Sequence, residues 1–312
     1  MSLKSRLRRI PLVLSVWRSL TRIPTVARLR ESMQLKQMYG QFAPESLVLE
    51  NSGTTMFLDP REKRGRAVLR CRAAGQPALK AIWGRMVREL NPTLVLDVGL
   101  NYGEFVLNER YSPAASIIGI EANPALLPWL ERSRVTHPNG EQMRFIHALA
   151  DAETASSGKF YINPAWSGSS SALAGSEQAG YTSCDVPVIA IDDLVAERDL
   201  EQERLAFKID VEGFEPRVMS GMTKLLQRCA SWIGLVEFNG AYLERLGVTA
   251  ESILKNLLDQ ACVFAIDHEG QSREIETPDW QKYFPGQSIS ELSVDLLLIS
   301  HGAKVPAAAL LG

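Results

Sequence analysis

The sequence lacks the residue patterns that mark several common classes of protein. Its 312 residues include only four cysteines (Cys71, Cys184, Cys229 and Cys262) and no C-x-x-C pair, which argues against a structural zinc site and a disulfide framework. Its longest apolar stretches, such as residues 10–17, are far shorter than the roughly 20 residues that cross a bilayer. We therefore expect reduced thiols, no transmembrane helix and a cytoplasmic protein.

Acidic residues are almost missing from the first 39 positions. This segment has nine basic side chains and one acidic one, and carries +8, whereas the whole chain carries −2 and the remainder −10. Apolar residues recur there at helical spacing, which predicts short basic amphipathic helices. Such helices could hold the protein at the inner face of an anionic membrane or on an acidic partner. A solvated helical cap packed on the protein is the alternative.

Two further classes are not expected for this basic segment. A signal peptide is not expected, because Arg18 and Arg22 interrupt the apolar residues and no cleavage site follows. A nucleic acid partner is not expected either, since the acidic remainder of the chain would repel phosphate.

Apolar and helical segments alternate from residue 91 onward. The expected strands are 93–98, 116–120, 143–149, 205–209, 232–238, 262–266 and 292–300, and the expected helices are 104–110, 123–134, 214–228 and 249–260. Strands that are apolar throughout are buried on both faces, and helix-length connections favour parallel pairing. We expect an α/β doubly wound, Rossmann-like sheet, mostly parallel, with its last two strands as an antiparallel hairpin at the edge.

The chain is expected to divide into three parts. Residues 1–40 form the helical extension, residues 41–90 a lead-in subdomain that ends in a helix over 77–90, and residues 91–312 the main domain. An insert over 151–190 is rich in glycine and serine and is expected to contain a loop over the site. In doubly wound sheets that site lies at the carboxyl ends of the strands.

The loop after the first strand of the main domain favours an adenosine cofactor. It runs D-V-G-L-N-Y-G from Asp97 to Gly103, and Glu121, at the end of the next strand, could accept hydrogen bonds from both ribose hydroxyls. A dinucleotide site needs G-x-G-x-x-G, but Asn101 replaces the middle glycine. Asp97 would repel a pyrophosphate and attract the ammonium of a methionine moiety, which indicates S-adenosylmethionine. A tight turn that binds nothing is the alternative for the loop alone.

Charged residues also gather at the ends of two later strands. Lys208, Asp210 and Glu212 end one strand, and Glu237 ends the next. A hydroxyl must lose its proton to attack a sulfonium methyl group, so we expect these three acids to prepare the acceptor while Lys208 fixes their geometry. Oxygens of Asp210, Glu237 and Asn239 could instead hold Mg²⁺, although no metal ligands are assigned. A plain Lys208–Asp210 ion pair is the alternative, and His147 is the next candidate base.

These motifs together resemble the FkbM-type methyltransferases. In order from Val95 to Asn239 they are V-L-D-V-G-L-N-Y-G-E-F, I-E-A-N-P, A-L-A-D, W-S-G-S-S-S-A-L, K-I-D-V-E-G-F-E and L-V-E-F-N. The resemblance implies a class I S-adenosylmethionine-dependent enzyme that methylates a hydroxyl oxygen of a sugar, glycan or other natural product. A nicotinamide-dependent oxidoreductase and a non-catalytic Rossmann-like binding module are the alternatives.

The resemblance also implies which residues surround the cofactor. The methionine part would lie by Asp97, Gly99, Asn101 and Gly103, the ribose by Glu121, the adenine by Asn123 and Ala148, and Ser170 would approach from the insert. For Asn123, a helix cap is an equally good interpretation.

Overall fold

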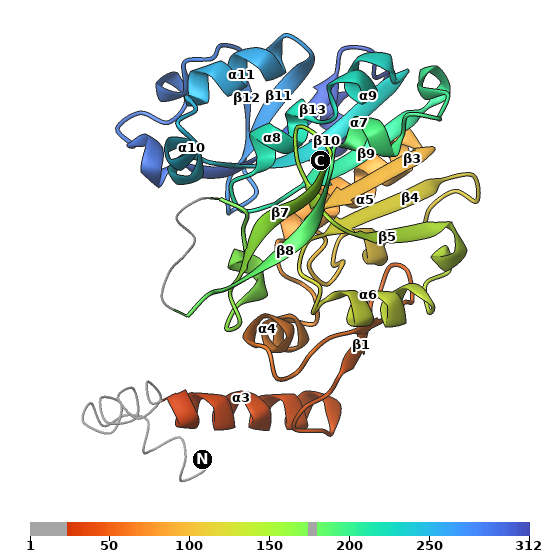
Figure 1. Ribbon diagram of the computed structural model, residues 1–312, viewed down its shortest axis with the longest axis vertical. Helices are drawn as coiled ribbons and strands as arrows, with labels where there is room; N and C mark the ends of the chain where they lie inside the picture. The colour runs from red at the N-terminus through yellow and green to blue at the C-terminus, as the bar shows by residue number, and fades with distance from the viewer. Residues whose placement is uncertain (1–23, 174–179) are drawn as a thin grey trace.

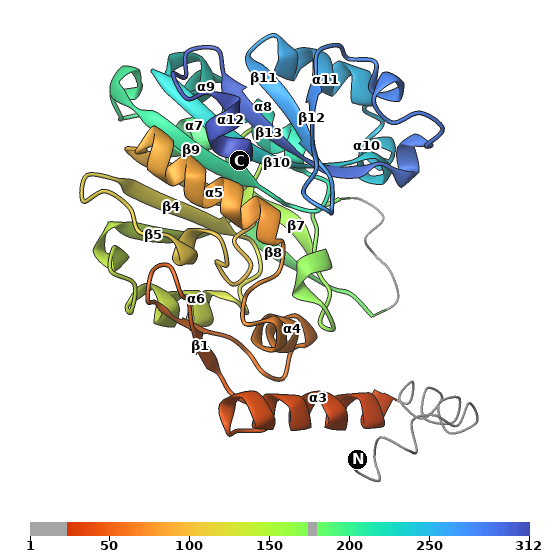
Figure 2. The ribbon, with the colours of Figure 1, turned by 180° about the vertical axis from the view of Figure 1, so that it is seen from behind.

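The computed structural model describes residues 24–173 and 180–312 (Figure 1). The first 23 residues of the predicted basic segment and residues 174–179 of the insert lie outside the described residues. Helix α3 (Pro24–Tyr39) lies at one end of the molecule, away from the large central sheet, in both views (Figures 1 and 2). The sequence predicts short helices within residues 1–39, whereas the described part of this segment forms one longer helix.

A mixed sheet of eight strands forms the centre of the molecule, in the order β12-β11-β13-β10-β9-β3-β4-β5. The parallel strands are β3 (Leu94–Val98), β4 (Ser116–Glu121), β5 (Met143–His147), β9 (Arg204–Ile209) and β10 (Ser231–Asn239). The C-terminal strands are β11 (Ala261–Ile266), β12 (Ser272–Ile275) and β13 (Ser293–Ser300). The predicted α/β fold with a mostly parallel sheet and antiparallel C-terminal strands is therefore confirmed.

The position of the last strand corrects the expected hairpin at the sheet edge. Strands β11 and β13 do pair antiparallel, but β13 lies between β10 and β11, so it is an interior strand. The edge is β12, which the sequence does not predict. This strand has the short sequence S-R-E-I, in which only Ile275 is buried. An edge strand is paired on one side only and tolerates charged residues, so it leaves a weak signal in the sequence.

Helices cover both faces of the sheet, and each face has its own apolar core. Helices α5 (Pro77–Leu90) and α12 (Ala307–Leu311) cover one face, in front in Figure 2. The other face, in front in Figure 1, is covered by α7 (Ile191–Leu194), α8 (Glu215–Ser220), α9 (Thr223–Arg228) and α11 (Ala250–Leu258). Along β3, Leu94 and Leu96 belong to the second core, while Val95 belongs to the first. This burial on both faces explains the continuous apolar strands.

Two of the expected helices take a different form in the structure. In place of a helix over 104–110 there is a 3₁₀ turn, Val106–Asn108, because the preceding residues Gly99, Asn101 and Gly103 all have a left-handed backbone with φ between 50° and 81°. The helix expected over 214–228 is divided into α8 and α9 near Gly221. A Cβ on Gly221 would lie 2.0 Å from the carbonyl oxygen of Asp151, so glycine allows the insert to approach closely there.

The segments before β3 and after β5 form smaller units beside the main sheet. Strands β1 (Ser46–Val48) and β2 (Thr55–Phe57) pair as an antiparallel hairpin, and α4 (Lys63–Cys71) follows them. Most of the insert forms a three-stranded sheet, ordered β6 (Leu149–Ala150), β8 (Thr182–Ile189) and β7 (Ala155–Ile162). The remaining short helices are α6 (Leu127–Arg134) and α10 (Gly240–Leu246).

Helix α4 is not predicted by the sequence, and its first residues explain why. Its N-cap is Glu62, whose side chain accepts hydrogen bonds from the backbone N–H groups of Arg64 and Gly65. The residues that usually mark a helix start at this position are serine, threonine, aspartate and asparagine.

Candidate functional site

A cavity of about 350 Å³ opens at the carboxyl ends of β3, β4 and β9. Its walls come from the loop after β3, the end of β4, the loop after β9, the insert and the region of α4 and α5. Seven of the predicted site residues line it: Gly99, Asn101, Glu121, Ala148, Ser170, Asp210 and Glu212. The cavity therefore lies where doubly wound folds bind their ligands.

Glu121 joins the loop after β3 to the end of β4. One of its carboxylate oxygens accepts a hydrogen bond from the backbone N–H of Asn101 and the other from that of Asn123, each at 2.7 Å. The side chain is largely buried, and burial raises the pKa of Glu121 to about 7. Each oxygen can accept a second hydrogen bond, so the carboxylate can hold the loop and also receive hydroxyl groups from the cavity.

Gly99 brings the loop into contact with the end of β9. Its φ is +81°, and a Cβ at this position would lie 1.9 Å from the carbonyl oxygen of Asp210. The backbone N–H of Asp210 also donates to the carbonyl of Val98 at 3.0 Å. Any side chain at position 99 would therefore separate the predicted cofactor loop from the predicted catalytic acid.

Three other predicted cofactor residues lie behind the cavity wall. Asp97 is 2% exposed, and burial raises its pKa to about 6 although the nearby Lys208 lowers it. Gly103 allows the loop to turn at φ +78°. Asn123 accepts a hydrogen bond from the backbone N–H of Ala125 at 3.1 Å, which is the capping role considered above. The structure gives these residues supporting positions under the loop.

The predicted catalytic residues lie at neighbouring strand ends. Lys208 Nζ lies 2.8 Å from Asp210 Oδ2, and the hydroxyl of Tyr242 donates to Glu212 Oε2 at 2.5 Å. Asp210 and Glu212 border the cavity, whereas Lys208 is 5% exposed and lies below them. Burial lowers the pKa of Lys208, but the carboxylates of Asp210 and Asp97 together raise it above its ordinary value. The ammonium therefore stays charged and orients Asp210.

Glu237 differs from the other acids of this region. Its Oε2 atom is buried and has no hydrogen-bond partner among the described residues. Burial, followed by the negative charge of Asp210, raises the pKa of Glu237 to about 10. Its carboxyl group is therefore neutral near pH 7, so it can donate a hydrogen bond but is not prepared to take a proton.

An acid that the sequence analysis does not select, Asp295 on β13, lies directly opposite Glu237 in the register of β10 and β13. Burial, and then the charge of Asp210, raises the pKa of Asp295 to about 6. Two acids facing each other across a strand pair are unfavourable when both are charged. The signal that could have found Asp295 is a single acid inside the otherwise apolar run V-D-L-L-L-I.

Replacing Glu237 by glutamine should raise the melting temperature at pH 9 by roughly 5 °C and leave it nearly unchanged at pH 5. The folded protein holds the Glu237 proton up to about pH 10, whereas the unfolded chain releases it near pH 4.5. The protonated Glu237 carboxyl therefore contributes to the free energy of unfolding at low pH, and this contribution is lost as the pH rises. Glutamine is always neutral and avoids that loss. Thermal unfolding at both pH values measures the effect, and Glu89→Gln, at an exposed position of α5, is the control.

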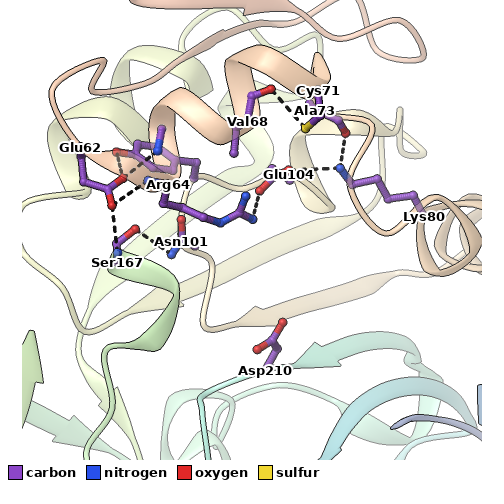
Figure 3. A network of polar contacts seen from close by, with 12 residues as sticks. Glu62, Arg64, Val68, Cys71, Ala73, Lys80, Asn101, Glu104, Ser167 and Asp210 are labelled. Atoms are coloured by element: carbon purple, nitrogen blue, oxygen red, sulfur yellow. Dashed lines mark hydrogen bonds and ion pairs between the residues drawn. The ribbon is translucent and has the colours of Figure 1, made fainter. Parts of the chain in front are cut away.

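One carboxylate links α4, the loop after β3 and the insert (Figure 3). Besides capping α4, Glu62 accepts hydrogen bonds from the backbone N–H of Ser167 at 3.0 Å and from the hydroxyl of Tyr102 at 3.3 Å. The amide of Asn101 donates to the hydroxyl of Ser167 at 3.2 Å. These contacts hold the Gly/Ser-rich part of the insert against the cavity. The sequence predicts a loop there but not its partner Glu62, which lies 105 residues away.

The described residues contain no group of three or more histidine, cysteine, aspartate or glutamate side chains placed to hold a metal ion. His147 lies beside the site, with its Nε2 atom 3.2 Å from the carbonyl oxygen of Ala122.

Comparison with known proteins identifies the family. A family model described as the methyltransferase FkbM domain matches residues 97–266, which is more than half of the chain and includes the loop after β3, Glu121 and Asp210. No curated protein matches the chain in sequence.

Several solved methyltransferases are similar to this chain in fold. An FkbM methyltransferase from Methylobacillus flagellatus KT has 12% identity, with a TM-score of 0.39 over 76% of this chain and 60% of that one. An O-methyltransferase involved in tomaymycin synthesis in Streptomyces achromogenes, in complex with SAM, has 10% identity and a TM-score of 0.40 over 88% and 89%. An O-methyltransferase from Bacillus cereus, in complex with SAH, has 9% identity and a TM-score of 0.39 over 92% and 97%.

The order of the strands, with β13 inserted antiparallel beside β10, defines an α/β fold like that of the class I methyltransferases. The chain belongs to the FkbM methyltransferase family. The expected class, an S-adenosylmethionine-dependent methyltransferase, is therefore confirmed, and family membership argues against the oxidoreductase alternative.

Proposed function

We propose that the protein transfers the methyl group of S-adenosylmethionine to a hydroxyl oxygen of a sugar, glycan or other natural product. The observation that carries the proposal is the carboxylate of Asp210, which borders the cavity beside the cofactor loop and is held by the buried ammonium of Lys208 at 2.8 Å. A positioned carboxylate is the group that a hydroxyl acceptor needs to lose its proton.

The residues around the cavity fit this cofactor. Glu121 offers carboxylate oxygens for ribose hydroxyls, and Ala148 lines the end of the cavity proposed for the adenine. Asn101 lines the other end, and its Oδ1 atom is buried without a hydrogen-bond partner among the described residues. Such an acceptor suits the ammonium of a methionine moiety. The bound cofactor would supply a methyl group on a cationic sulfur.

The charged residues then take different roles in the proposed reaction. Asp210 accepts the hydroxyl proton of the acceptor, and Lys208 holds the Asp210 carboxylate in position through their ion pair. Burial raises the pKa of Glu212 to about 7, so its carboxyl is partly protonated near neutral pH and can either donate a hydrogen bond to the substrate hydroxyl or accept one from it. Glu237, in its neutral form, completes the polar surface behind them.

Calorimetry with S-adenosylhomocysteine and with NAD⁺ tests the cofactor, followed by transfer of a labelled methyl group from S-adenosylmethionine to a panel of hydroxylated and amino acceptors. We expect binding of S-adenosylhomocysteine and no binding of NAD⁺, and then transfer to hydroxylated compounds. Binding of NAD⁺ alone, or transfer confined to amines, would contradict the proposal.

We further propose that the basic N-terminal segment attaches the protein to an anionic membrane surface. No helix of the described residues is long and apolar enough to cross a membrane. In α3, Leu29 and Met33 are about 60% exposed, beside the exposed Arg28 and Lys36. The single acid, Glu31, turns the other way and pairs with Arg66 and Arg70 of α4. The outward side of α3 therefore presents exposed apolar side chains among basic and polar ones.

Flotation with lipid vesicles tests this attachment on the full chain. We expect binding to vesicles that contain phosphatidylglycerol and little binding to pure phosphatidylcholine, since each basic residue contributes about 1 kcal/mol near an anionic surface. The double substitution Leu29→Ser and Met33→Ser should reduce the bound fraction severalfold. Equal flotation on the two kinds of vesicle would count against the attachment. The exposed Val135→Ser on the main domain is the control.

A further inference from the structure

The cavity continues beyond the proposed cofactor loop to a wall that comes mostly from segments before the sequence motifs. Arg64 of α4, Gly75 and Gln76 before α5, and Glu104 line this end. Arg64 and Glu104 are charged; Glu104 directly follows the predicted cofactor loop, whereas Arg64 comes from a segment that carries none of the predicted site residues. A charged pair in a cavity wall needs a reason, because charges are favourable there only when they are paired or meet a ligand.

Two cations share one carboxylate at this end of the cavity. Glu104 is 6% exposed and forms ion pairs with Arg64, through Nη2, and with Lys80, at 3.3 Å. Figure 3 shows Glu104 between the two basic side chains, with Asp210 on the opposite side of the site. The group of three carries +1, while Asp210 and Glu212 make the other side negative.

The guanidinium of Arg64 has unused hydrogen-bonding capacity. Among the described residues its side chain donates to Glu104 through Nη2 alone, although a guanidinium has five N–H donors. Its Cζ lies 5.7 Å from the ring centroid of Trp166 in the insert, and its side chain keeps 24% exposure. Arg64 is thus held in place on two sides and still open to the cavity.

We propose that Arg64 binds the carboxylate of the amino acid part of S-adenosylmethionine, while Glu104 and Asn101 receive its ammonium. This rests on the proposed cofactor site. The amino acid part is a zwitterion, and the Arg64–Glu104 pair presents the complementary charges in the same cavity. The planar guanidinium can form two parallel hydrogen bonds to a carboxylate. The net +1 of the group with Lys80 favours the anionic end there, and the negative side at Asp210 favours the cationic sulfur.

A purely structural role is the competing explanation, in which Arg64 only fastens α4 to the turn at Glu104. The two explanations differ in which ligand they affect. S-adenosylhomocysteine contains the amino acid part, whereas 5′-methylthioadenosine has the same adenosine and sulfur but no carboxylate or ammonium. Loss of a direct contact would weaken binding of S-adenosylhomocysteine alone, whereas a general loosening of the cavity would weaken binding of both ligands.

The test measures the affinity of both ligands by calorimetry for wild type, Arg64→Gln and Arg64→Lys in the full chain. Arg64→Gln should weaken S-adenosylhomocysteine about ten- to a hundredfold, as expected for charge-assisted hydrogen bonds, and leave 5′-methylthioadenosine within about twofold. Arg64→Lys should fall between, because lysine keeps the charge without the planar fork. Arg66→Gln, on the same helix but paired with Glu31, should change neither affinity.

Two results would overturn the assignment of Arg64. These are unchanged binding of S-adenosylhomocysteine to a folded Arg64→Gln protein, or an equal loss for both ligands. Failure of the wild type to bind either ligand would instead overturn the proposed cofactor site, and with it this role of Arg64. The ligand comparison in the wild type thus separates the two failures.

Discussion

Asp210→Asn should lower methyl transfer by about 10² to 10⁴, the usual range for loss of a general base, and change affinity for S-adenosylmethionine by no more than a few fold. Asparagine keeps the size of the side chain but cannot take a proton. The backbone at position 210 stays in place because its N–H donates to the carbonyl oxygen of Val98. The measurement compares turnover of a labelled methyl group with calorimetric affinity for the cofactor.

Matched variants make this result specific. Asp185→Asn, which removes an exposed ion pair with Lys159 in the insert, should leave turnover unchanged. Dialysis against a chelator separates a base from a metal, because only a metal-dependent enzyme loses activity that Mg²⁺ restores. If Asp210→Asn keeps near-normal turnover, the base lies elsewhere, and His147 is the next residue to replace.

Glu121→Ala should weaken binding of S-adenosylmethionine about ten- to a hundredfold, which corresponds to a charge-assisted contact of roughly 1.5 to 3 kcal/mol. The loss has two sources, because the carboxylate is proposed to bind ribose and also accepts the backbone N–H groups of Asn101 and Asn123. Glu131→Ala, on the exposed surface of α6, is the control. An unchanged dissociation constant for a folded Glu121→Ala protein would remove Glu121 from the cofactor site.

The same carboxylate should make cofactor binding depend on pH. Burial raises the pKa of Glu121 to about 7, so the group is largely protonated at pH 6 and ionised at pH 8. Hydroxyl donors of the ribose prefer the ionised form, so affinity should rise from pH 6 to pH 8. Calorimetry at the two pH values measures the rise. Glu121→Gln has no titrating group at this position and should flatten the rise; an unchanged rise would assign it to another acid.

Most of the sheet could be predicted from the sequence, because a strand buried on both faces has a strong local pattern. The five parallel strands and the two long C-terminal strands coincide with the apolar stretches of the sequence. The loop after β3 and Glu121 could also be recognised, because the motifs that identify them consist of residues close together in the chain. By contrast, β12 and α4 carry charged residues over short segments, and their position depends on contacts made after folding.

The site shows the same division between local and distant information. Asp210 and Glu212 follow directly from a local motif, and both line the cavity. Arg64 has no such motif, and its place depends on a partner 40 residues away. The neutral state of Glu237 could not be predicted either, because it comes from burial near acids that lie in the loop after β9, on α8 and on β13. The residue types indicated that this region is rich in acids, whereas the protonation states of these acids could be inferred only from the packing around them.

The carboxylate of Glu62 has a consequence for where members of such a family can diverge. The segment matched by the family model begins at Asp97, yet Glu62 and Arg64 precede it and complete one side of the cavity. A fragment trimmed to the matched segment would retain the cofactor loop but lose the helix that anchors the insert over it. Exchange of residues 41–90 between relatives would therefore change one wall of the cavity while leaving the sheet, the loop after β3 and Asp210 untouched.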